Sequence, residues 1–309
     1  RASGGDADAD ASRFLDPMVA SSVRGLRMHD VLAVAVEIAH EAGALIRERF
    51  GRIDQVRFKG AVNPVTETDT AAEAVILSRL RAAFPEHGIL GEESGGDAWQ
   101  VSRMAPSRLA KSEAMWLVDP LDGTNNFAHG FPHICVSLGL MVSGAIEVGV
   151  VYDPLRDETF AALRGAGATL NGVAIRVSTV DSLSRAFLAT GFPYDRRVGA
   201  SNNVGMLDCF LRRSQGVRRA GSAALDLAYV ACGRFDGFWE PGLSPWDMAA
   251  GSLLVQEAGG RVSDFGGGVT WLFSGDEVIA SNGRIHDEML VVLRDGPAAP
   301  HPDFPILDA

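Results

Sequence analysis

Two carboxylates stand three residues apart, directly after an apolar run, in the segment Asp119-Pro120-Leu121-Asp122-Gly123-Thr124. Because a proline lies between them, we expect the chain to turn here and to aim both side chains and the Leu121 carbonyl at one point. Such hard oxygen ligands suit Mg²⁺, which also favours a substrate phosphate. If Gly123 and Thr124 open a helix, their backbone amides form a phosphate-binding end. Taken alone, the segment is more typical of an Asx-type turn with a solvated acidic rim.

Three further segments carry candidate groups, each with a purely structural alternative. Gly91-Glu92-Glu93-Ser94 follows an apolar strand, where ligand sites collect, although an exposed acidic turn has the same pattern. Ser244-Pro245-Trp246-Asp247 reads as a helix start with Asp247 at its third position, which needs no metal. Asp69 stands ahead of a predicted helix and could simply complement its dipole. Lys59 is one of two lysines among 28 basic residues, which favours a role that arginine cannot fill.

The order of these segments carries a family resemblance. K-x₄-P-V-T-x-T-D, G-E-E-S, W-x-x-D-P-x-D-G-T-x-N-F and P-W-D-x-A-A-G together resemble the inositol monophosphatase family of Mg²⁺-dependent, lithium-sensitive phosphatases. The likeness covers about residues 30–292 and includes Gly221-Ser222-Ala223-Ala224 and Glu257-Ala258-Gly259-Gly260. It implies a layered α-β-α-β-α sandwich shared with fructose-1,6-bisphosphatase. Residue periodicity is compatible with that fold but does not identify it.

The resemblance also implies a metal site with two or three Mg²⁺ ions. By motif position, Glu92, Asp119 and the Leu121 carbonyl hold the first ion. Asp119, Asp122 and Asp247 hold the second, and a looser third ion lies near Glu92. Five carboxylates in one site are tolerable when divalent cations neutralise them, and those cations reverse the local field for an anionic substrate.

The remaining roles are carried over in the same way. The groups that position or deprotonate the attacking water are Glu92, Asp69 and Thr124. The substrate-binding set comprises Lys59, Asp122, Gly123, Thr124, Gly221, Ala223, Glu240 and Asp247. Within that set, the Gly123 and Thr124 amides receive phosphate, while Gly221, Ala223 and Glu240 contact the inositol ring.

Regular elements are predicted from caps, turns and periodicity. Asp30 is expected to cap a helix reaching Phe50, and a capping box at Thr70-x-x-Glu73 to start a second helix that stops at Pro85. Ser143-Gly144 and Asn171-Gly172 predict hairpin turns. Strands are expected at 87–90, 115–118, 186–190, 236–240 and 278–281, and later helices near 201–213, 222–233 and 245–258.

These elements predict four segments along the chain. We expect residues 1–28 to be disordered or extended, because they open with a small, polar and acidic stretch. An antiparallel α+β half spans 29–180 with most metal ligands, and an α/β half spans 181–295 with the substrate contacts and Asp247. Residues 296–309 form a Pro-rich, loose tail.

Composition limits the partners. The 309 residues carry a net charge of −11, which argues against binding nucleic acid or an anionic membrane surface. No apolar run is long enough to span a membrane, so a soluble protein is expected. Its three cysteines form no disulfide framework, which favours a reducing compartment: the cytoplasm, or a plastid stroma after removal of a transit peptide.

The leading hypothesis is hydrolysis of myo-inositol monophosphates to myo-inositol and phosphate by a metal-activated water, in a homodimer implied by the resemblance. Alternatives are the same chemistry on fructose-1,6-bisphosphate, histidinol phosphate or 3′-phosphoadenosine nucleotides. A different class is a regulatory binding protein of the transcription machinery, with the arginines of 212–219 as the first candidate surface. His129 and His133 are expected to be loop residues, because Pro132 breaks the helix that a zinc pair would need.

Overall fold

The computed structural model describes residues 27–52, 56–59, 63–94, 114–193, 202–269, 272 and 277–296. The expected disordered start and loose tail therefore lie almost entirely outside the described residues, although Met28 already belongs to the first helix. No helix in these ranges is both long and apolar enough to cross a membrane.

The larger sheet has seven strands in the order β3-β4-β5-β6-β7-β8-β9. Its first pair is parallel and the others are antiparallel. The strands are β3 (Gly88–Gly91), β4 (Ala114–Asp122), β5 (Cys135–Val142), β6 (Ala145–Asp153), β7 (Glu158–Leu163), β8 (Gly167–Leu170) and β9 (Val173–Ala174). Alternate residues of β4 face opposite sides: Trp116 and Val118 pack with α1 (Met28–Arg49) and α2 (Glu67–Ala83), and Leu117 packs with the central helices.

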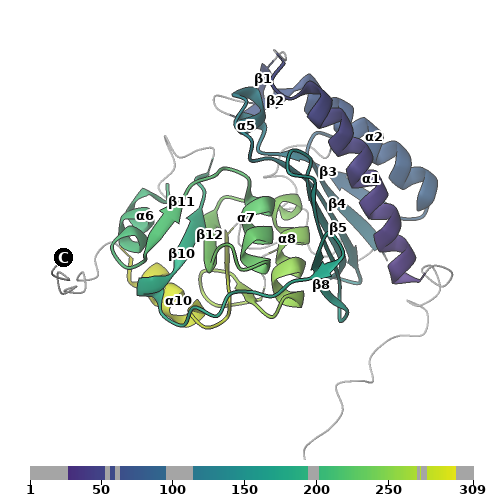
Figure 1. Ribbon diagram of the computed structural model, residues 1–309. Coiled ribbons are helices and arrows are strands. Elements are labelled where there is room, and N and C mark those ends of the chain that lie inside the picture. Colours follow the sequence, from purple (N-terminus) through teal and green to yellow (C-terminus); the bar gives the residue numbers. More distant parts are fainter. Residues whose placement is uncertain are drawn as a thin grey trace, which may run out of the picture.

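The smaller sheet has five strands in the order β11-β10-β12-β14-β13. They are β11 (Gly216–Arg218), β10 (Phe187–Thr190), β12 (Gly237–Pro241), β14 (Glu277–Ser281) and β13 (Arg261–Ser263). Helices α7 (Ala223–Ala231) and α8 (Pro245–Glu257) lie between the two sheets, and α6 (Val204–Leu211) and α10 (His286–Asp295) cover the outer face (Figure 1). This arrangement confirms the expected α-β-α-β-α layers.

Four short elements complete the described chain. Strands β1 (Val56–Lys59) and β2 (Asn63–Thr66) pair antiparallel ahead of α2. The five-residue helix α5 (Thr124–Ala128) directly follows β4, as the Gly123-Thr124 pattern predicts. A 3₁₀ turn, η1 (Leu183–Arg185), leads into β10.

Two glycines of the large sheet allow α8 to approach its surface. A Cβ at Gly139 would lie 2.8 Å from Ala249 Cβ, and one at Gly149 would lie 2.9 Å from the Ala250 carbonyl oxygen. Side chains at either position would push the helix away. The first turn of this closely packed helix carries Asp247, one of the predicted metal ligands.

The predicted starts of the first two helices are wrong. The first helix begins at Met28 with Arg27 as its N-cap, so Asp30 lies in its first turn. The second is capped by Thr66, whose side chain and that of Asp69 bond each other's backbone amides, and not by Thr70 and Glu73. Thr66 is favoured as the N-cap because the Asp69 side chain can accept a hydrogen bond from the Thr66 backbone amide in return.

The chain does not turn at Pro120 as expected. Strand β4 continues to Asp122 through a bulge, because Asp119 pairs with Ser137 while Asp122 pairs with Cys135. One extra residue therefore opposes the partner strand. Proline has no N–H to donate to a ladder and is tolerated at such a bulge. The two predicted hairpin turns are confirmed, with positive φ at Ser143, Gly144, Asn171 and Gly172.

Candidate active site

Predicted metal ligands from three elements converge at the end of β4. Burial raises the pKa of Asp119 well above its usual value, and the negative charges of Glu92, Asp122 and Asp247 raise it further. Glu92 lies in the turn after β3, and Asp247 lies in the first turn of α8. The parallel pairing of β3 and β4 brings the G-E-E-S turn to this end of the sheet.

Asp119 and Asp247 form the buried centre of this cluster. Asp119 is 2% exposed, and its Oδ1 accepts the Leu121 amide at 3.0 Å. Asp247 Oδ2 accepts the Ser244 amide at 2.7 Å. Burial and the charge of Asp122 raise the pKa of Asp247 to about 7, although a hydrogen bond with Asp119 opposes that shift. Full ionisation of these two buried carboxyl groups is therefore disfavoured when no cation is bound.

Asp122 joins the metal segment to the start of α7. Its Oδ2 accepts the Ser222 hydroxyl at 2.8 Å and the Ala224 amide at 2.7 Å. Burial nevertheless raises the pKa of Asp122. These bonds place the ligand segment beside Ala223, a predicted substrate contact.

Asp69 and Thr124, the predicted water-positioning pair, are in direct contact. Thr124 donates its hydroxyl to Asp69 Oδ1 at 2.8 Å, and the same hydroxyl oxygen lies 3.2 Å from the Leu121 carbonyl oxygen. Asp69 Oδ2 accepts the Thr66 amide at 2.8 Å, so the residue caps α2 as well. Burial raises the pKa of Asp69 to about 6, which keeps a proton acceptor poised near neutral pH.

Glu73 supports the G-E-E-S turn. The sequence analysis assigned Glu73 to a helix cap and did not predict this role. Its Oε1 accepts the Glu93 amide at 3.0 Å and the Ser94 amide at 3.2 Å. A Cβ at Gly91 would lie 2.2 Å from the same oxygen, so a side chain there would displace the Glu73 carboxylate from the turn. The glycine that opens G-E-E-S was the available signal.

Glu240, the predicted ring contact, lies near the end of β12. Burial raises the pKa of Glu240 well above its usual value, the charge of Asp226 adds to the shift, and Arg219 opposes it. A Cβ at Gly191 would lie 2.0 Å from Glu240 Oε1, so this unpredicted glycine makes room for the carboxyl group.

Asn126 links the metal segment to the predicted ring contacts. Its Nδ2 lies 2.9 Å from the Ala220 carbonyl oxygen, 3.2 Å from that of Gly221 and 2.7 Å from that of His133. Gly221 has φ +89°, a conformation that favours glycine. The N of D-G-T-x-N-F marked Asn126 only as part of the family motif.

A buried His133–Asp226 pair lies behind these groups. His133 Nε2 stands 3.1 Å from Asp226 Oδ1, and the side chains are 7% and 1% exposed. Burial raises the pKa of Asp226 to about 6, and the neighbouring His133 partly opposes the rise in the pKa of Asp122. His133 is a loop residue as expected, but its buried pairing was not foreseen because its partner is distant in sequence.

The donor set fits a hard divalent cation. Among the described residues, no three histidine, cysteine, aspartate or glutamate side chains are already arranged as ligands of one ion. Asp119, Asp122 and Asp247 each direct an oxygen to a backbone amide. Carboxylates that raise one another's pKa nonetheless form the oxygen-only environment that Mg²⁺ prefers. The Lys59 side chain lies outside the described residues, so its role stays a prediction.

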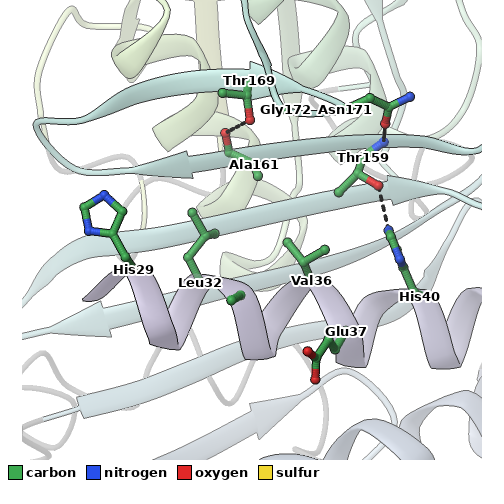
Figure 2. Close-up of a pocket in the computed structure, with 11 residues that line it drawn as sticks. His29, Leu32, Val36, Glu37, His40, Thr159, Ala161, Thr169, Asn171 and Gly172 are labelled. Carbon is green, nitrogen blue, oxygen red and sulfur yellow. Dashed lines mark hydrogen bonds between the residues drawn. The ribbon is translucent and has the colours of Figure 1, made fainter. Parts of the chain in front are cut away.

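A groove of about 630 Å³ lies elsewhere, between α1 and the β7–β8 hairpin (Figure 2). Leu32 and Val36 of α1 line it, and His40 Nε2 lies 2.7 Å from Thr159 Oγ1 at one end. None of the predicted metal, catalytic or substrate residues lines this groove.

Comparison with known proteins identifies the family. The model of the inositol monophosphatase family matches residues 27–296. Nus factor SuhB of Escherichia coli is 45% identical over 270 residues, or 87% of this chain and 97% of that protein. Inositol-1-monophosphatase of Synechocystis is 46% identical over 267 residues, covering 86% and 89%. The solved inositol monophosphatase of Anabaena shares 42% identity at a TM-score of 0.75, covering 87% and 97%. The chain belongs to the inositol monophosphatase family.

Proposed function

We propose that the protein is a Mg²⁺-dependent phosphomonoesterase that hydrolyses myo-inositol monophosphates and similar polyol phosphates. The observation that carries the proposal is the convergence of Glu92, Asp119, Asp122 and Asp247 beside the Asp69–Thr124 pair. Phosphoester hydrolysis as the reaction class is supported by membership of the inositol monophosphatase family and by similarity to a relative named inositol-1-monophosphatase.

In this proposal Glu92, Asp119, the Leu121 carbonyl, Asp122 and Asp247 hold the ions. Bound Mg²⁺ supplies Lewis acidity and lowers the pKa of water. The chain's own part in the attack is carried by Asp69 and Thr124. Because Thr124 donates to Asp69, its oxygen is left to accept a hydrogen bond from the attacking water. As the water attacks, its proton would pass to the Thr124 oxygen while the Thr124 hydroxyl proton passes to the Asp69 carboxylate.

The rest of the site orients the substrate. The Gly123 and Thr124 amides at the start of α5 bind phosphate oxygens, and Glu240 accepts a hydrogen bond from a ring hydroxyl. Asp122, through its bonds to Ser222 and Ala224, keeps the phosphate and ring subsites in register. Positioning and charge stabilisation of this kind account for most of the catalysis in phosphoryl transfer.

The deciding experiment is phosphate release from a panel of esters in the presence of Mg²⁺. The panel comprises myo-inositol 1-phosphate, fructose 1,6-bisphosphate, histidinol phosphate, a 3′-phosphoadenosine nucleotide and an aryl phosphate. Inositol phosphate is expected to rank high in kcat/KM. A dominant rate on another ester would favour the corresponding alternative, and no release from any of them would refute phosphatase function.

Activity is expected to depend strictly on Mg²⁺ and to be inhibited by Li⁺ and by high Ca²⁺. Ca²⁺ is larger and accepts looser geometry, so it occupies oxygen ligands without aligning water for attack. Phosphate release is measured across Mg²⁺, Li⁺ and Ca²⁺ titrations. Full activity in excess chelator would exclude the metal assignment.

Glu73→Ala is expected to weaken the dependence on Mg²⁺ through the turn that carries Glu92. The substitution leaves the Glu93 and Ser94 amides without their acceptor. Residues that orient metal ligands typically affect metal affinity by about 10–100-fold. The half-saturating Mg²⁺ concentration is measured, with Glu73→Gln as the control that retains an acceptor oxygen. An unchanged half-saturating Mg²⁺ concentration for Glu73→Ala would show that the G-E-E-S turn keeps its conformation without Glu73.

A regulatory role is a second candidate, favoured by the relatives named Nus factor SuhB. Exposed Arg218 and Arg212 are the first surface to test, although Arg212 is paired with Asp208. Neutralising both should remove a transcription-machinery partner in a pull-down while phosphatase activity is retained. Absence of any partner of the unaltered protein would end this hypothesis.

We also infer a homodimer, on the basis of the family alone. Light scattering at micromolar concentration is expected to give twice the chain mass, and a monomeric mass would contradict it. The three cysteines are free thiols, two of them buried. This state supports a reducing compartment in the proposal, namely the cytoplasm or a plastid stroma.

A further inference from the structure

Arg219 stands beside the predicted ring contacts but has no role among them. Its guanidinium carbon lies 5.8 Å from the centre of the Phe192 ring. A Cβ at Gly221 would lie 2.7 Å from Arg219 Nη1, so the guanidinium group passes directly over that glycine. Its charge also acts on Glu240 and Asp226, whose pKa shifts it opposes. The cation therefore faces the same region as Glu240.

The donors of Arg219 are available. The residue is exposed, and within the described part of the chain it makes no hydrogen bond or ion pair. Two nearby or comparable arginines are already paired: Arg212 with Asp208, and Arg234 with Glu158. The guanidinium group of Arg219 lies against the Phe192 ring and the backbone of Gly221. These contacts hold its position and leave its N–H groups free to donate.

We propose that Arg219 binds a second anionic group of the substrate, so that for a given polyol the site favours the ester carrying a second such group over the corresponding monophosphate. The inference rests on the proposed phosphatase function and narrows its substrate class. A guanidinium group presents paired donors that match phosphate or carboxylate oxygens. Without Arg219, Glu240 and Asp226 would repel a second phosphate in this region. Arg219 supplies the opposite charge beside the carboxyl group that receives the ring hydroxyl.

The alternative is that Arg219 only offsets the charge of Glu240. The two roles differ in what they discriminate. An offset of charge would help every substrate that contacts Glu240, whether it carries one phosphate or two. An anion contact would help only the substrate with the second phosphate.

The experiment compares matched substrate pairs that differ by one phosphate. They are fructose 1-phosphate with fructose 1,6-bisphosphate, and myo-inositol 1-phosphate with myo-inositol 1,4-bisphosphate. Arg219→Gln is expected to lower the kcat/KM ratio of bisphosphate to monophosphate in at least one pair by roughly 10- to 150-fold, the scale of a hydrogen bond to a charged group. Arg219→Lys keeps the positive charge but loses the paired N–H donors of the guanidinium group. Its bisphosphate-to-monophosphate ratio of kcat/KM should lie between those of wild type and Arg219→Gln.

Arg218→Gln is the matched control. Arg218 is also exposed, but its Nη1 donates to the Val217 carbonyl and its guanidinium lies 4.5 Å from the Phe187 ring centre. Its substitution should leave both ratios unchanged. If Arg219→Gln leaves the ratio unchanged in both pairs, or lowers both members of each pair equally, the proposal is overturned.

Failure of the proposed function is recognised separately. If wild-type protein releases phosphate from no ester, including an aryl phosphate, the phosphatase proposal fails. Calorimetric titration of fructose 1,6-bisphosphate in Mg²⁺ then decides the inference. Binding that Arg219→Gln weakens while Arg218→Gln does not supports it. Absent binding, or binding that is equal in both variants, overturns it.

Discussion

Replacement of Asp119 by asparagine is expected to abolish phosphate release from every ester. The residue is assigned to both principal ions, and the substitution removes its charge with almost no change in shape. Removal of one preorganised electrostatic group typically lowers kcat by about 10²–10³-fold, and a residue shared by two ions should reach or exceed that scale. The measurement is kcat at saturating Mg²⁺.

The same substitution is expected to stabilise the ion-free fold. Burial and the charges of Glu92, Asp122 and Asp247 raise the pKa of Asp119 above its unfolded value, so the folded protein binds protons more tightly. The free energy of unfolding therefore falls as pH rises above about 4. Asparagine cannot ionise, so the variant does not lose this part of its free energy of unfolding as pH rises. Its gain in stability over wild type should therefore be larger at pH 8 than at pH 4. For a chain of this size, each kcal/mol corresponds to about 2–4 °C in Tm.

Thermal unfolding in chelator at the two pH values checks the second result. A variant that is less stable than wild type yet keeps its specific activity would make Asp119 structural and not catalytic. A stability gain that is equal at both pH values would show that charge repulsion is not its cause.

Glu240 and Asp247 are expected to respond differently to substitution, although only six residues lie between them. Asp247→Asn should lower kcat for all phosphoesters alike, because Asp247 is assigned to the second ion. Glu240→Gln should change selectivity: kcat/KM for inositol monophosphate should fall by roughly 10- to 150-fold relative to an aryl phosphate without ring hydroxyls. That scale corresponds to one lost charge-assisted hydrogen bond.

The pH dependence sharpens this test. Burial raises the pKa of Glu240, so the ionised acceptor becomes more populated as pH rises. The advantage of wild type over Glu240→Gln on inositol phosphate should therefore grow with pH. Equal damage to both substrates would place Glu240 in the metal machinery or the fold, and the ring assignment would be wrong.

Local signals were sufficient for much of the fold. The turns at Ser143-Gly144 and Asn171-Gly172 were predictable because each requires positive φ at adjacent positions, which few residue types adopt. The start of α8 was predictable because Ser244, Pro245 and Asp247 satisfy the helix end among themselves. The order of the motifs was sufficient to identify the family and, through it, the layered sandwich.

Tertiary structure decided how the candidate site is held together. The Asp122–Ala224 bond spans 102 residues and the His133–Asp226 pair spans 93, so no local pattern could reveal either. Glu73 has the spacing of a helix cap, yet it holds the G-E-E-S turn because β3 brings that turn to its side chain. Nothing in the sequence distinguishes Arg219 from the other arginines. Only the structure shows that it lies against Gly221 and Phe192, in the region of Glu240. The sequence by itself determined which groups are present and how each segment begins and ends. Only packing decided which groups meet, because partners distant along the chain are selected by the whole core.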